Sequence, residues 1–326
     1  MSIEELIHPD DTKALKVLMN IPALPQVMEK VFEYGYDEIS WTENLTTNLR
    51  LSETQMPEIY NRLPPICERL GIPVPELYLQ MSNIANSWTS GRKKVYIVLT
   101  LGLIRRVKGD ALDAVLAHEC GHILCQHVLY QTLANAIFSF GESFSDSLVG
   151  MVGNVAMKPI RQALIAWSRA SELSADRVAC AITSAEALAH ALIKIDMIPK
   201  NIADTIDIKT WAQQGKDFED MKKGSTWNKI VRWMANSDAD HPFSPVRVYE
   251  AMNWEKSETC MKLKACDSCW NLEQKEQLVP SLTNTLIDKT ESVAKNISSL
   301  TKGISLDSTL SKFGIHKKQK SLYGKG

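Results

Sequence analysis

The sequence lacks a long apolar run. Among its 326 residues, the longest such stretch is Val95–Ile104, about ten residues interrupted by Thr100 and Gly102. A membrane-spanning helix needs roughly 20 apolar residues. The chain begins Met-Ser-Ile-Glu-Glu, with acidic residues where a secretory signal peptide carries basic ones. We therefore expect neither a transmembrane span nor secretion, and we predict a cytoplasmic protein.

The sequence also lacks an excess of charge of either sign. It has 37 Lys and Arg against 38 Asp and Glu, a formal net charge of −1. Nucleic-acid binding selects for a basic surface, so no nucleic-acid partner is expected. The neutral total hides a basic end, because residues 281–326 contain 8 Lys and 3 acidic residues, a net charge of +5. We expect a mobile tail there, with a frayed amphipathic helix as the alternative, and any weak membrane or acidic-partner contact would use it.

A disulfide framework is absent as well. The seven cysteines are odd in number and scattered over a long chain, which favours reduced thiols in the cytosol. Cys260, Cys266 and Cys269 lie near one another. Unpaired thiols are the favoured interpretation, and a zinc knuckle or a redox pair are the alternatives.

The distribution of apolar residues predicts a mostly helical α+β fold with a small β-sheet. The first expected element is an amphipathic helix over 56–70 that is kinked or split at Pro64-Pro65 and stops at Gly71. Two strands over 75–80 and 94–101 follow, separated by a turn-rich loop over 86–91, and then a long helical stretch over about 110–136 and further helix over 161–195. Residues 137–160 match no clear pattern. An ordinary loop and helix is favoured there over a flap or a membrane-surface patch.

One short string carries the clearest chemical signal. His118-Glu119-Cys120-Gly121-His122 has the pattern H-E-x-x-H. Residues four apart lie on one face of a helix, so His118 and His122 can hold one metal ion, and imidazole nitrogens suit Zn²⁺. Glu119 falls beside the metal, where it can take a proton from a zinc-bound water. By itself the pattern also occurs by chance, on helices whose side chains only make surface hydrogen bonds.

A second acidic segment lowers the odds of chance. The stretch Trp167–Arg177 contains Glu172 and Asp176, four residues apart. A catalytic zinc with two His ligands needs one more protein ligand, and Glu172 can supply it. Asp176 can accept the free ring N–H of a zinc-bound His. Two carboxylates at this spacing repel each other on an exposed helix, so the pair makes sense beside a dication.

Together the two strings resemble the gluzincin metallopeptidases of the CAAX-prenyl-protease/HtpX group. Residues 86–91 followed by 96–103 are similar to that family's substrate-binding edge strand and the strand before its active-site helix. His241-Pro242, with Arg247 beyond, resembles its late His-Pro…Arg element. The resemblance covers about 51–254 and implies a zincin-like metallopeptidase domain.

The resemblance also implies roles for individual residues. One zinc ion would be held by His118, His122 and Glu172, with Glu119 as general base and then acid, and Asp176 behind the ligands. His241 or Arg247 would contact the substrate or stabilise the oxyanion, although His241 could equally be a loop residue that caps a backbone group. Trp88, Thr89 and Ser90 would contact the substrate.

His127 matches a position where the family often has a histidine. At 3.6 residues per turn it would be rotated roughly 140° from His122. We therefore expect a hydrogen-bonded packing residue and not a ligand. Cys120, inside the motif, should point away from the metal and pack as a buried thiol.

These observations suggest four segments: an N-terminal helical segment over 1–50, a zinc metallopeptidase domain over 51–255, a Cys-containing extension over 256–280, and the basic tail over 281–326. The main hypothesis is a zinc-dependent metalloendopeptidase acting on peptides or unfolded proteins. The alternative is a zinc-stabilised binding or chaperone-like module with little or no turnover. A third possibility is a latent enzyme, blocked by residues 1–50 or by the tail.

Overall fold

The computed structural model describes residues 2–33, 35–92, 94–139, 154–196, 198–223, 242–266 and 269–270. The chain divides into two compact units, 1–278 and 279–326, and every described residue belongs to the first. His241, the basic tail and residues 140–153 lie outside the described residues, so the expectations for them are not addressed by the structure.

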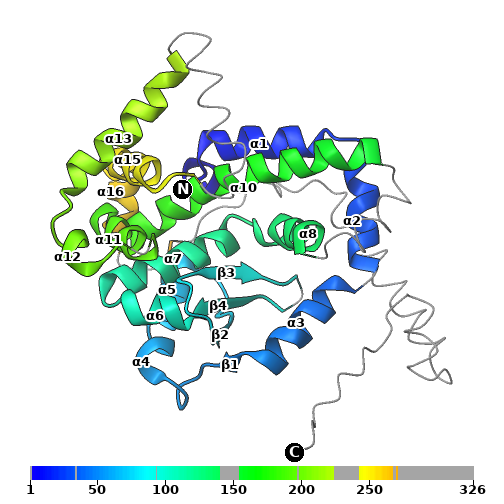
Figure 1. Ribbon diagram of the computed structural model, residues 1–326, viewed down its shortest axis with the longest axis horizontal. Helices are drawn as coiled ribbons and strands as arrows, with labels where there is room; N and C mark the ends of the chain where they lie inside the picture. The colour runs from blue at the N-terminus through cyan, green and yellow to red at the C-terminus, as the bar shows by residue number, and fades with distance from the viewer. Residues whose placement is uncertain are drawn as a thin grey trace, which may run out of the picture. The chain divides into compact units, whose positions relative to one another are not determined.

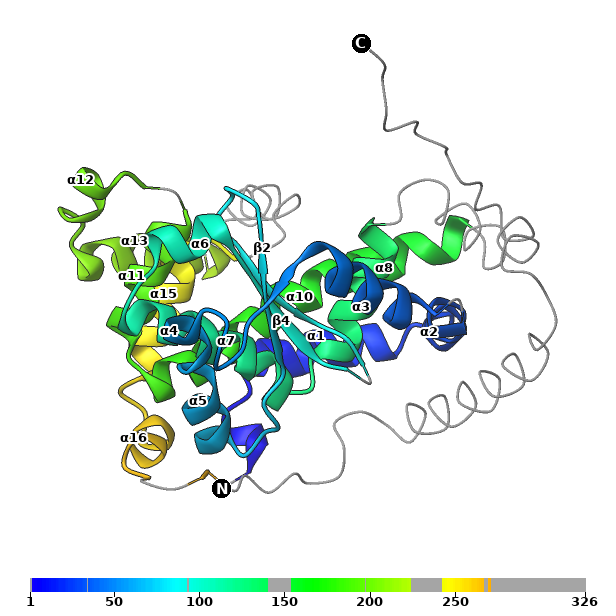
Figure 2. The same cartoon turned by 90° about the horizontal axis from the view of Figure 1, so that it is seen from below.

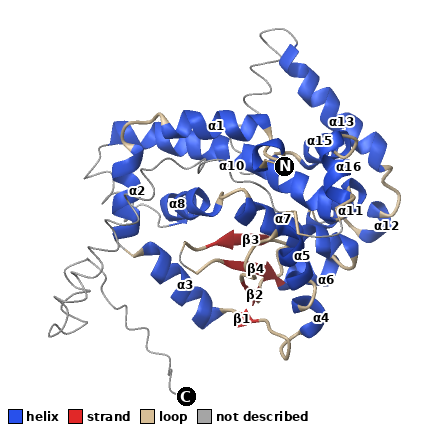
Figure 3. Ribbon diagram, turned by 180° about the vertical axis from the view of Figure 1, so that it is seen from behind, coloured by secondary structure: helices blue, strands red, loops and turns tan. Residues whose placement is uncertain are grey.

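Helices dominate the described chain, and four short strands form one sheet (Figure 3). The helices are α1 (Pro9–Met19), α2 (Leu24–Glu33), α3 (Tyr36–Thr47), α4 (Pro57–Tyr60), α5 (Leu63–Leu70), α6 (Leu101–Arg106), α7 (Asp110–Leu124), α8 (Val128–Ser139), α10 (Asn154–Ile182), α11 (Ala185–Ile195), α12 (Lys200–Ala203), α13 (Ile208–Asp220), α15 (Ser244–Trp254) and α16 (Glu258–Lys264). The strands are β1 (Leu49–Arg50), β2 (Glu76–Gln80), β3 (Ser87–Ser90) and β4 (Tyr96–Thr100). None of the helices in the described part of the chain is long and apolar enough to cross a membrane.

The sheet has the order β1-β2-β4-β3, so β3 is an edge strand. β2 and β4 are parallel, and β3 runs antiparallel to β4 with Trp88 opposite Val98. The interpretation of 86–91 as a loop was therefore wrong. Its Ser, Asn and Gly residues are typical of turns, but backbone pairing with β4 outweighs that weak local preference. The edge strand expected from the family resemblance is found at this position.

Alternate residues of the inner strands face opposite sides of the sheet. Leu77, Leu79, Ile97 and Leu99 belong to the main hydrophobic core, together with residues of α5 and α7. Tyr78, Tyr96 and Val98 form a smaller cluster on the other face, against which Trp41 of α3 packs. The sheet thus separates the core that carries α7 from the layer formed by α3.

The N-terminal segment is part of the same core. Ile3, Leu6 and Ile7 pack in the cluster that contains Leu112 and Leu116 of α7. Helix α1 lies beside α10, as the two perpendicular views agree (Figures 1 and 2). The division at residue 50 stays a prediction, but side chains from both sides of it share one interior.

The stretch predicted to be helical over about 110–136 is helical, but it consists of two helices with a break that was not predicted. Helix α7 ends at Leu124 and α8 begins at Val128. Between them Gln126 adopts a left-handed conformation with φ of 60°, and the His127 N–H donates to the His122 carbonyl at 2.9 Å. This is a common way to close a helix, but glycine usually occupies the left-handed position. Because Gln126 stands there instead, composition gave no sign of the break.

Two other boundaries differ from expectation for local reasons. The stretch over 56–70 is split into α4 and α5, one of the two expected outcomes, but the break comes before the prolines. Pro64 lies at the second position of α5, where its missing N–H is not needed. Gly71 ends α5 in a left-handed conformation, as expected. The helical stretch over 161–195 divides at Ser184, whose side chain caps the start of α11.

Gly121 lets the two helices that carry the motif residues approach closely. A Cβ atom at this position would lie 3.0 Å from the Ala175 Cα of α10 and 3.0 Å from the Val178 Cβ. Real Cβ contacts are rarely so short. The close approach of α7 to α10 is what brings Glu172 to the histidines of α7.

A larger residue at position 121 should force these helices apart. Gly121→Val is expected to lower the free energy of unfolding by about 1–3 kcal/mol through overpacking, and to weaken metal binding because Glu172 moves away. Urea unfolding and zinc titration would measure both effects. Gly121→Ala demands a shift of only a few tenths of an ångström. Its stability and zinc affinity should therefore lie between those of the wild type and of Gly121→Val. Normal stability and metal binding in Gly121→Val would contradict this account of the helix contact.

Candidate metal and catalytic site

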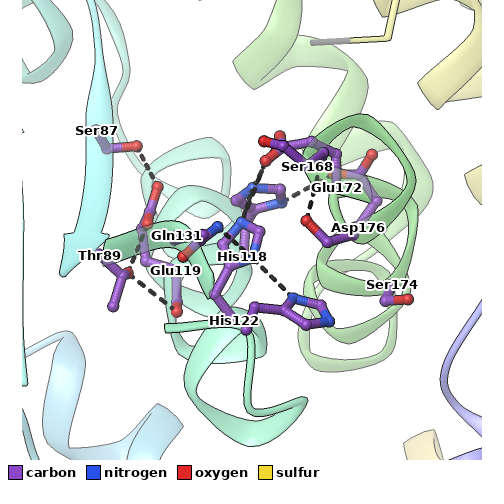
Figure 4. Close-up of polar contacts among 12 residues, drawn as sticks. Ser87, Thr89, His118, Glu119, His122, Gln131, Ser168, Glu172, Ser174 and Asp176 are labelled. Carbon is purple, nitrogen blue, oxygen red and sulfur yellow. Dashed lines mark hydrogen bonds and ion pairs between the residues drawn. The ribbon is translucent and has the colours of Figure 1, made fainter. Parts of the chain in front are cut away.

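Three buried side chains from two helices converge on one point (Figure 4). The Nε2 atoms of His118 and His122 on α7 are 3.2 Å apart. Glu172 on α10 places Oε2 3.4 Å from the His118 Nε2 and Oε1 3.3 Å from the His122 Nε2. In the described part of the chain, this is the one group of three His, Cys, Asp or Glu side chains that could hold a metal ion.

The spacing of these donors suits zinc. With zinc–ligand bonds of about 2.0–2.2 Å, two ligands of a tetrahedral ion lie about 3.4 Å apart. The two Nε2 atoms are 3.2 Å apart, close to that edge, and each has a different oxygen of Glu172 at 3.3 or 3.4 Å, so the carboxylate faces both histidines. Two imidazoles and one carboxylate are also a donor set typical of catalytic zinc, which keeps its fourth position for water or substrate.

Asp176 and Arg247 fix the His118 ring on its Nδ1 side, away from the metal group. The Asp176 Oδ1 lies 2.9 Å from the His118 Nδ1. Arg247 on α15 donates to both Asp176 oxygens, from Nε at 2.8 Å and from Nη2 at 2.7 Å, and its Nη1 lies 3.3 Å from Glu172. Asp176 therefore lies where a zinc-bound histidine needs an acceptor.

This placement bears on the expected role of Arg247. Its guanidinium is buried and faces two carboxylates of the site. These contacts support a role in positioning His118 and Glu172. Arg247 also lines the cleft beside the metal group, so its predicted contact with the substrate stays a prediction. Its suggested partner in oxyanion stabilisation, His241, lies outside the described residues.

The electrostatics of the histidine pair favour a cation between them. Burial alone would lower the pKa of His118, but the charges and hydrogen bonds of Glu172 and Asp176 outweigh it and raise the pKa to about 10. Burial, helped by the charges of His118 and His127, lowers the pKa of His122. Burial opposes ionisation of Asp176 too, yet Arg247 and His118 lower its pKa. Without a metal ion, one proton on His118 compensates the carboxylates, and metal binding would displace it.

Two hydroxyl groups of β3 hold the carboxylate of Glu119. The Ser87 Oγ donates to Oε1 at 2.6 Å, and the Thr89 Oγ1 donates to Oε2 at 2.7 Å (Figure 4). Ser87 and Thr89 share one face of the strand because side chains alternate. Thr89, expected to contact substrate, thus contacts the predicted general base, and Ser87 is a residue that the sequence analysis missed.

Sequence reasoning also missed the partners of His122. The His122 Nδ1 lies 2.9 Å from the His127 Nδ1 and 2.9 Å from the Gln131 Nε2. The His127 Nε2 lies 2.9 Å from the Oδ2 of Asp11, a buried residue of α1. His127 is outside the ligand group, as expected, but the argument from helical rotation does not apply, because the chain reverses at Gln126. No periodic pattern marked Asp11 as chemically active.

A cleft of about 860 Å³ opens beside these residues. Its lining includes β3 residues 87–90 on one side, and Val115, Leu192 and Phe243. Trp88 is half-buried and packs against the cluster on the α3 face of the sheet, while Ser90 is buried. Both line the cleft, so their predicted contact with a substrate stays a prediction.

The cysteines lie apart from the metal group. Cys120 is buried, with its Sγ 3.8 Å from that of Cys67, which agrees with a packed thiol on the far side of α7. Cys260 is buried, whereas Cys266 and Cys269 are half-buried. The seven cysteines form no disulfide, as expected from their number and scatter.

Comparison with known proteins identifies the family. The sequence profile of peptidase family M48 matches residues 53–255, more than half of the chain. The chain belongs to peptidase family M48. It is accordingly a metallopeptidase, in agreement with the family resemblance, and the family's metal-dependent chemistry fits the group His118, His122 and Glu172.

Curated relatives in the M48 family come from plants, bacteria and archaea. The plastoglobule-localized metallopeptidase 48, chloroplastic, of Arabidopsis thaliana is 27% identical over 261 residues, which are 79% of this chain and 74% of that protein. A protease HtpX homologue of Trichormus variabilis is 30% identical over 47% of this chain and 61% of that protein, and one of Thermococcus sibiricus is 31% identical over 45% and 59%. The chain thus spans about three fifths of these HtpX homologues. The crystal structure of S. mikatae Ste24p aligns with a TM-score of 0.44 at 19% identity, over 74% of this chain and 62% of that one.

Removing the buried guanidinium should destabilise this M48 chain. Arg247→Met leaves Asp176 and Glu172 without their cation, and we expect a loss of about 3–5 kcal/mol in the free energy of unfolding of the metal-free protein. Urea unfolding in a chelator would measure it. Arg105→Met, at an exposed arginine bound to Asn83, should change stability by less than about 0.5 kcal/mol. Equal effects of the two substitutions would contradict the proposed charge compensation.

Proposed function

We propose that this M48 chain is a zinc-dependent metalloendopeptidase in which Glu119 acts as general base and then general acid. The observation that carries the proposal is the convergence of two histidine nitrogens and one carboxylate beside a second carboxylate that is not part of the group. The Nε2 atoms of His118 and His122 are 3.2 Å apart, and the Glu172 carboxylate faces both of them. Glu119, next to His118 on α7, instead faces the hydroxyls of β3 at the cleft.

Each residue of the site has a separate role in the proposed reaction. When bound, zinc supplies Lewis acidity for the carbonyl oxygen and makes water more acidic. Glu119 takes the proton of the attacking water and later delivers it to the leaving amine. Ser87 and Thr89 orient its carboxylate through two hydrogen bonds. Asp176 and Arg247 fix the ring of His118, so that its Nε2 faces the metal site.

We further propose that the substrate is an extended segment that pairs with β3. In the sheet order β3 is the outer strand, and it lines the cleft. Backbone pairing at an edge strand selects for extended chain, which unfolded proteins and peptides provide. The identity of the natural substrate and the cytoplasmic location stay predictions, and the Arabidopsis relative is named as a protein of chloroplast plastoglobules.

A zinc-stabilised binding module remains the competing hypothesis. A closed structural site would need a fourth protein ligand, whereas a catalytic site keeps that position for water or substrate. Among the described residues, the metal group has three members, and Glu119 is engaged by hydroxyls. These features favour the catalytic hypothesis.

Glu119→Gln tests the mechanism. We expect loss of about 10³-fold in kcat/KM because the amide cannot accept the proton, with zinc content unchanged because Glu119 is not a ligand. Cleavage of an unfolded protein, with sites mapped by mass spectrometry, would be compared with bound zinc by elemental analysis. Glu53→Gln, on the surface, is the control. Cleavage at the wild-type rate by Glu119→Gln would end the proposal.

Thr89→Val tests the orientation of the base. Valine keeps the shape of threonine but cannot donate to Glu119, so we expect kcat to fall by about tenfold with little change in KM. Thr89→Ser should restore most of the activity. Thr132→Val is a matched control, because it removes a buried hydroxyl that bonds only the backbone of Val128 and Gly91. If Thr132→Val lowers kcat as much as Thr89→Val, the effect is one of stability and not of base orientation.

A further inference from the structure

A chain of hydrogen bonds runs from the N-terminal helix to the metal site. Asp11 on α1 contacts His127 at 2.9 Å, and His127 contacts His122 at 2.9 Å through its other ring nitrogen. Asp11, His127 and His122 are each at most 3% exposed. Ser174 on α10 also donates to the Asp11 Oδ2 at 2.6 Å, and the N–H of His8 donates to Ser174 at 2.9 Å. Asp11, which lies on α1, is therefore also fixed by a hydrogen bond from α10.

When His122 binds a metal, only one assignment of the ring protons satisfies every hydrogen bond between Asp11, His127 and His122. A metal at the His122 Nε2 requires that atom to be unprotonated, so the proton of the neutral ring is on Nδ1. The His122 Nδ1–H then donates to the His127 Nδ1, which must be unprotonated. The proton of His127 is consequently on Nε2, where it donates to the Asp11 carboxylate. Asp11 thus selects the tautomer of His127, and His127 selects that of His122.

Gln131 agrees with the same assignment. Its amide lies 2.9 Å from the His122 Nδ1, and its Oε1 atom is buried without a hydrogen-bond partner. The two ends of an amide have the same shape, so their assignment follows from the hydrogen-bond network. Turning the amide places Oε1 toward the His122 Nδ1–H, so that the amide oxygen gains a donor and His122 gains a second acceptor beside His127. The second acceptor strengthens the same tautomer of His122.

We propose that Asp11 and His127 are positioning residues for the metal ligand His122, and that helix α1 is thereby a working part of the metal site. The inference rests on the proposed ligand set. It goes beyond the family match, which begins at residue 53 and does not include Asp11. His118 is oriented by Asp176 and Arg247, which follow the motif in the sequence. His122 is instead oriented through His127 by a residue near the N-terminus, Asp11.

The test measures zinc affinity, by competition with a chromophoric chelator on the full-length protein. Asp11→Asn keeps the size of the side chain but removes its charge, and we expect the Kd for zinc to rise by at least about tenfold, as is typical when a residue behind a metal ligand is lost. Asp10→Asn is the matched control, because it removes a charge one residue away that pairs with Lys13. Its Kd should stay within twofold of the wild type.

His127→Phe provides a second variant if Asp11→Asn does not fold. It keeps an aromatic ring against Trp167, where His127 makes an edge contact, but it has no ring nitrogen. We expect the same rise in Kd, together with a changed visible spectrum of the Co²⁺-substituted protein, which reports ligand geometry. A purely structural role would lower the melting temperature of the metal-free protein and leave the Kd of the folded molecules unchanged. That result, in either variant, would overturn the proposal.

Zinc affinity is measured separately from peptide cleavage, so the role of Asp11 and the proposed function can fail independently. A wild-type protein that binds zinc tightly but cleaves nothing would refute the proposed function and leave the role of Asp11 intact. If the wild-type protein cleaves peptides and a folded Asp11→Asn protein binds zinc equally tightly, the role of Asp11 is refuted and the proposed function stands.

Discussion

The structure around the metal site depends on the neutralisation of buried negative charge. Asp11, Glu119, Glu172 and Asp176 all lie in the interior near the two motif histidines. Moving an isolated carboxylate out of water is unfavourable by several kcal/mol, so each one needs a partner. Arg247 supplies a single positive charge for Asp176 and Glu172. Hydroxyl and imidazole groups serve the others, and a divalent cation between His118, His122 and Glu172 would supply most of the remaining compensation.

This constraint makes the metal part of the folded state as well as of the chemistry. Glu172 and Asp176 raise the pKa of His118, so a proton on that ring would offset part of their charge where no cation is bound. Metal binding and release of that proton are therefore linked. The close approach of α7 and α10 at Gly121 is possible because the charges it brings together are compensated.

The part of the site that could be predicted from the sequence is the part set by local helix geometry. His118 and His122, like Glu172 and Asp176, are four residues apart, so the helical period alone places each pair on one face. Arg247 was found by family resemblance, but its contacts with Asp176 and Glu172 were not predicted, because they depend on how α15 packs. Asp11 is 116 residues from His127 in the sequence, and no spacing rule reaches that far. The break at Gln126 was missed because it uses a residue with no preference for turns.

The fold shows the same division between local and distant causes. The two inner strands and the stop at Gly71 were predicted because apolar runs and a glycine cap act locally. Strand β3 was misread from composition because its Ser and Thr residues pair with β4 for reasons of tertiary structure. Those same residues turn out to be the ones that hold Glu119.

Strand β3 is short, and its side chains are already occupied. Ser87 and Thr89 face the base, Ser90 is buried, and only Trp88 remains to vary its contacts with a bound chain. A peptide lying along this edge would therefore be recognised by its backbone more than by its side chains. With the proposed pairing to β3, such an enzyme would discriminate between folded and unfolded states of its targets, and its selectivity would come from which proteins lose their structure.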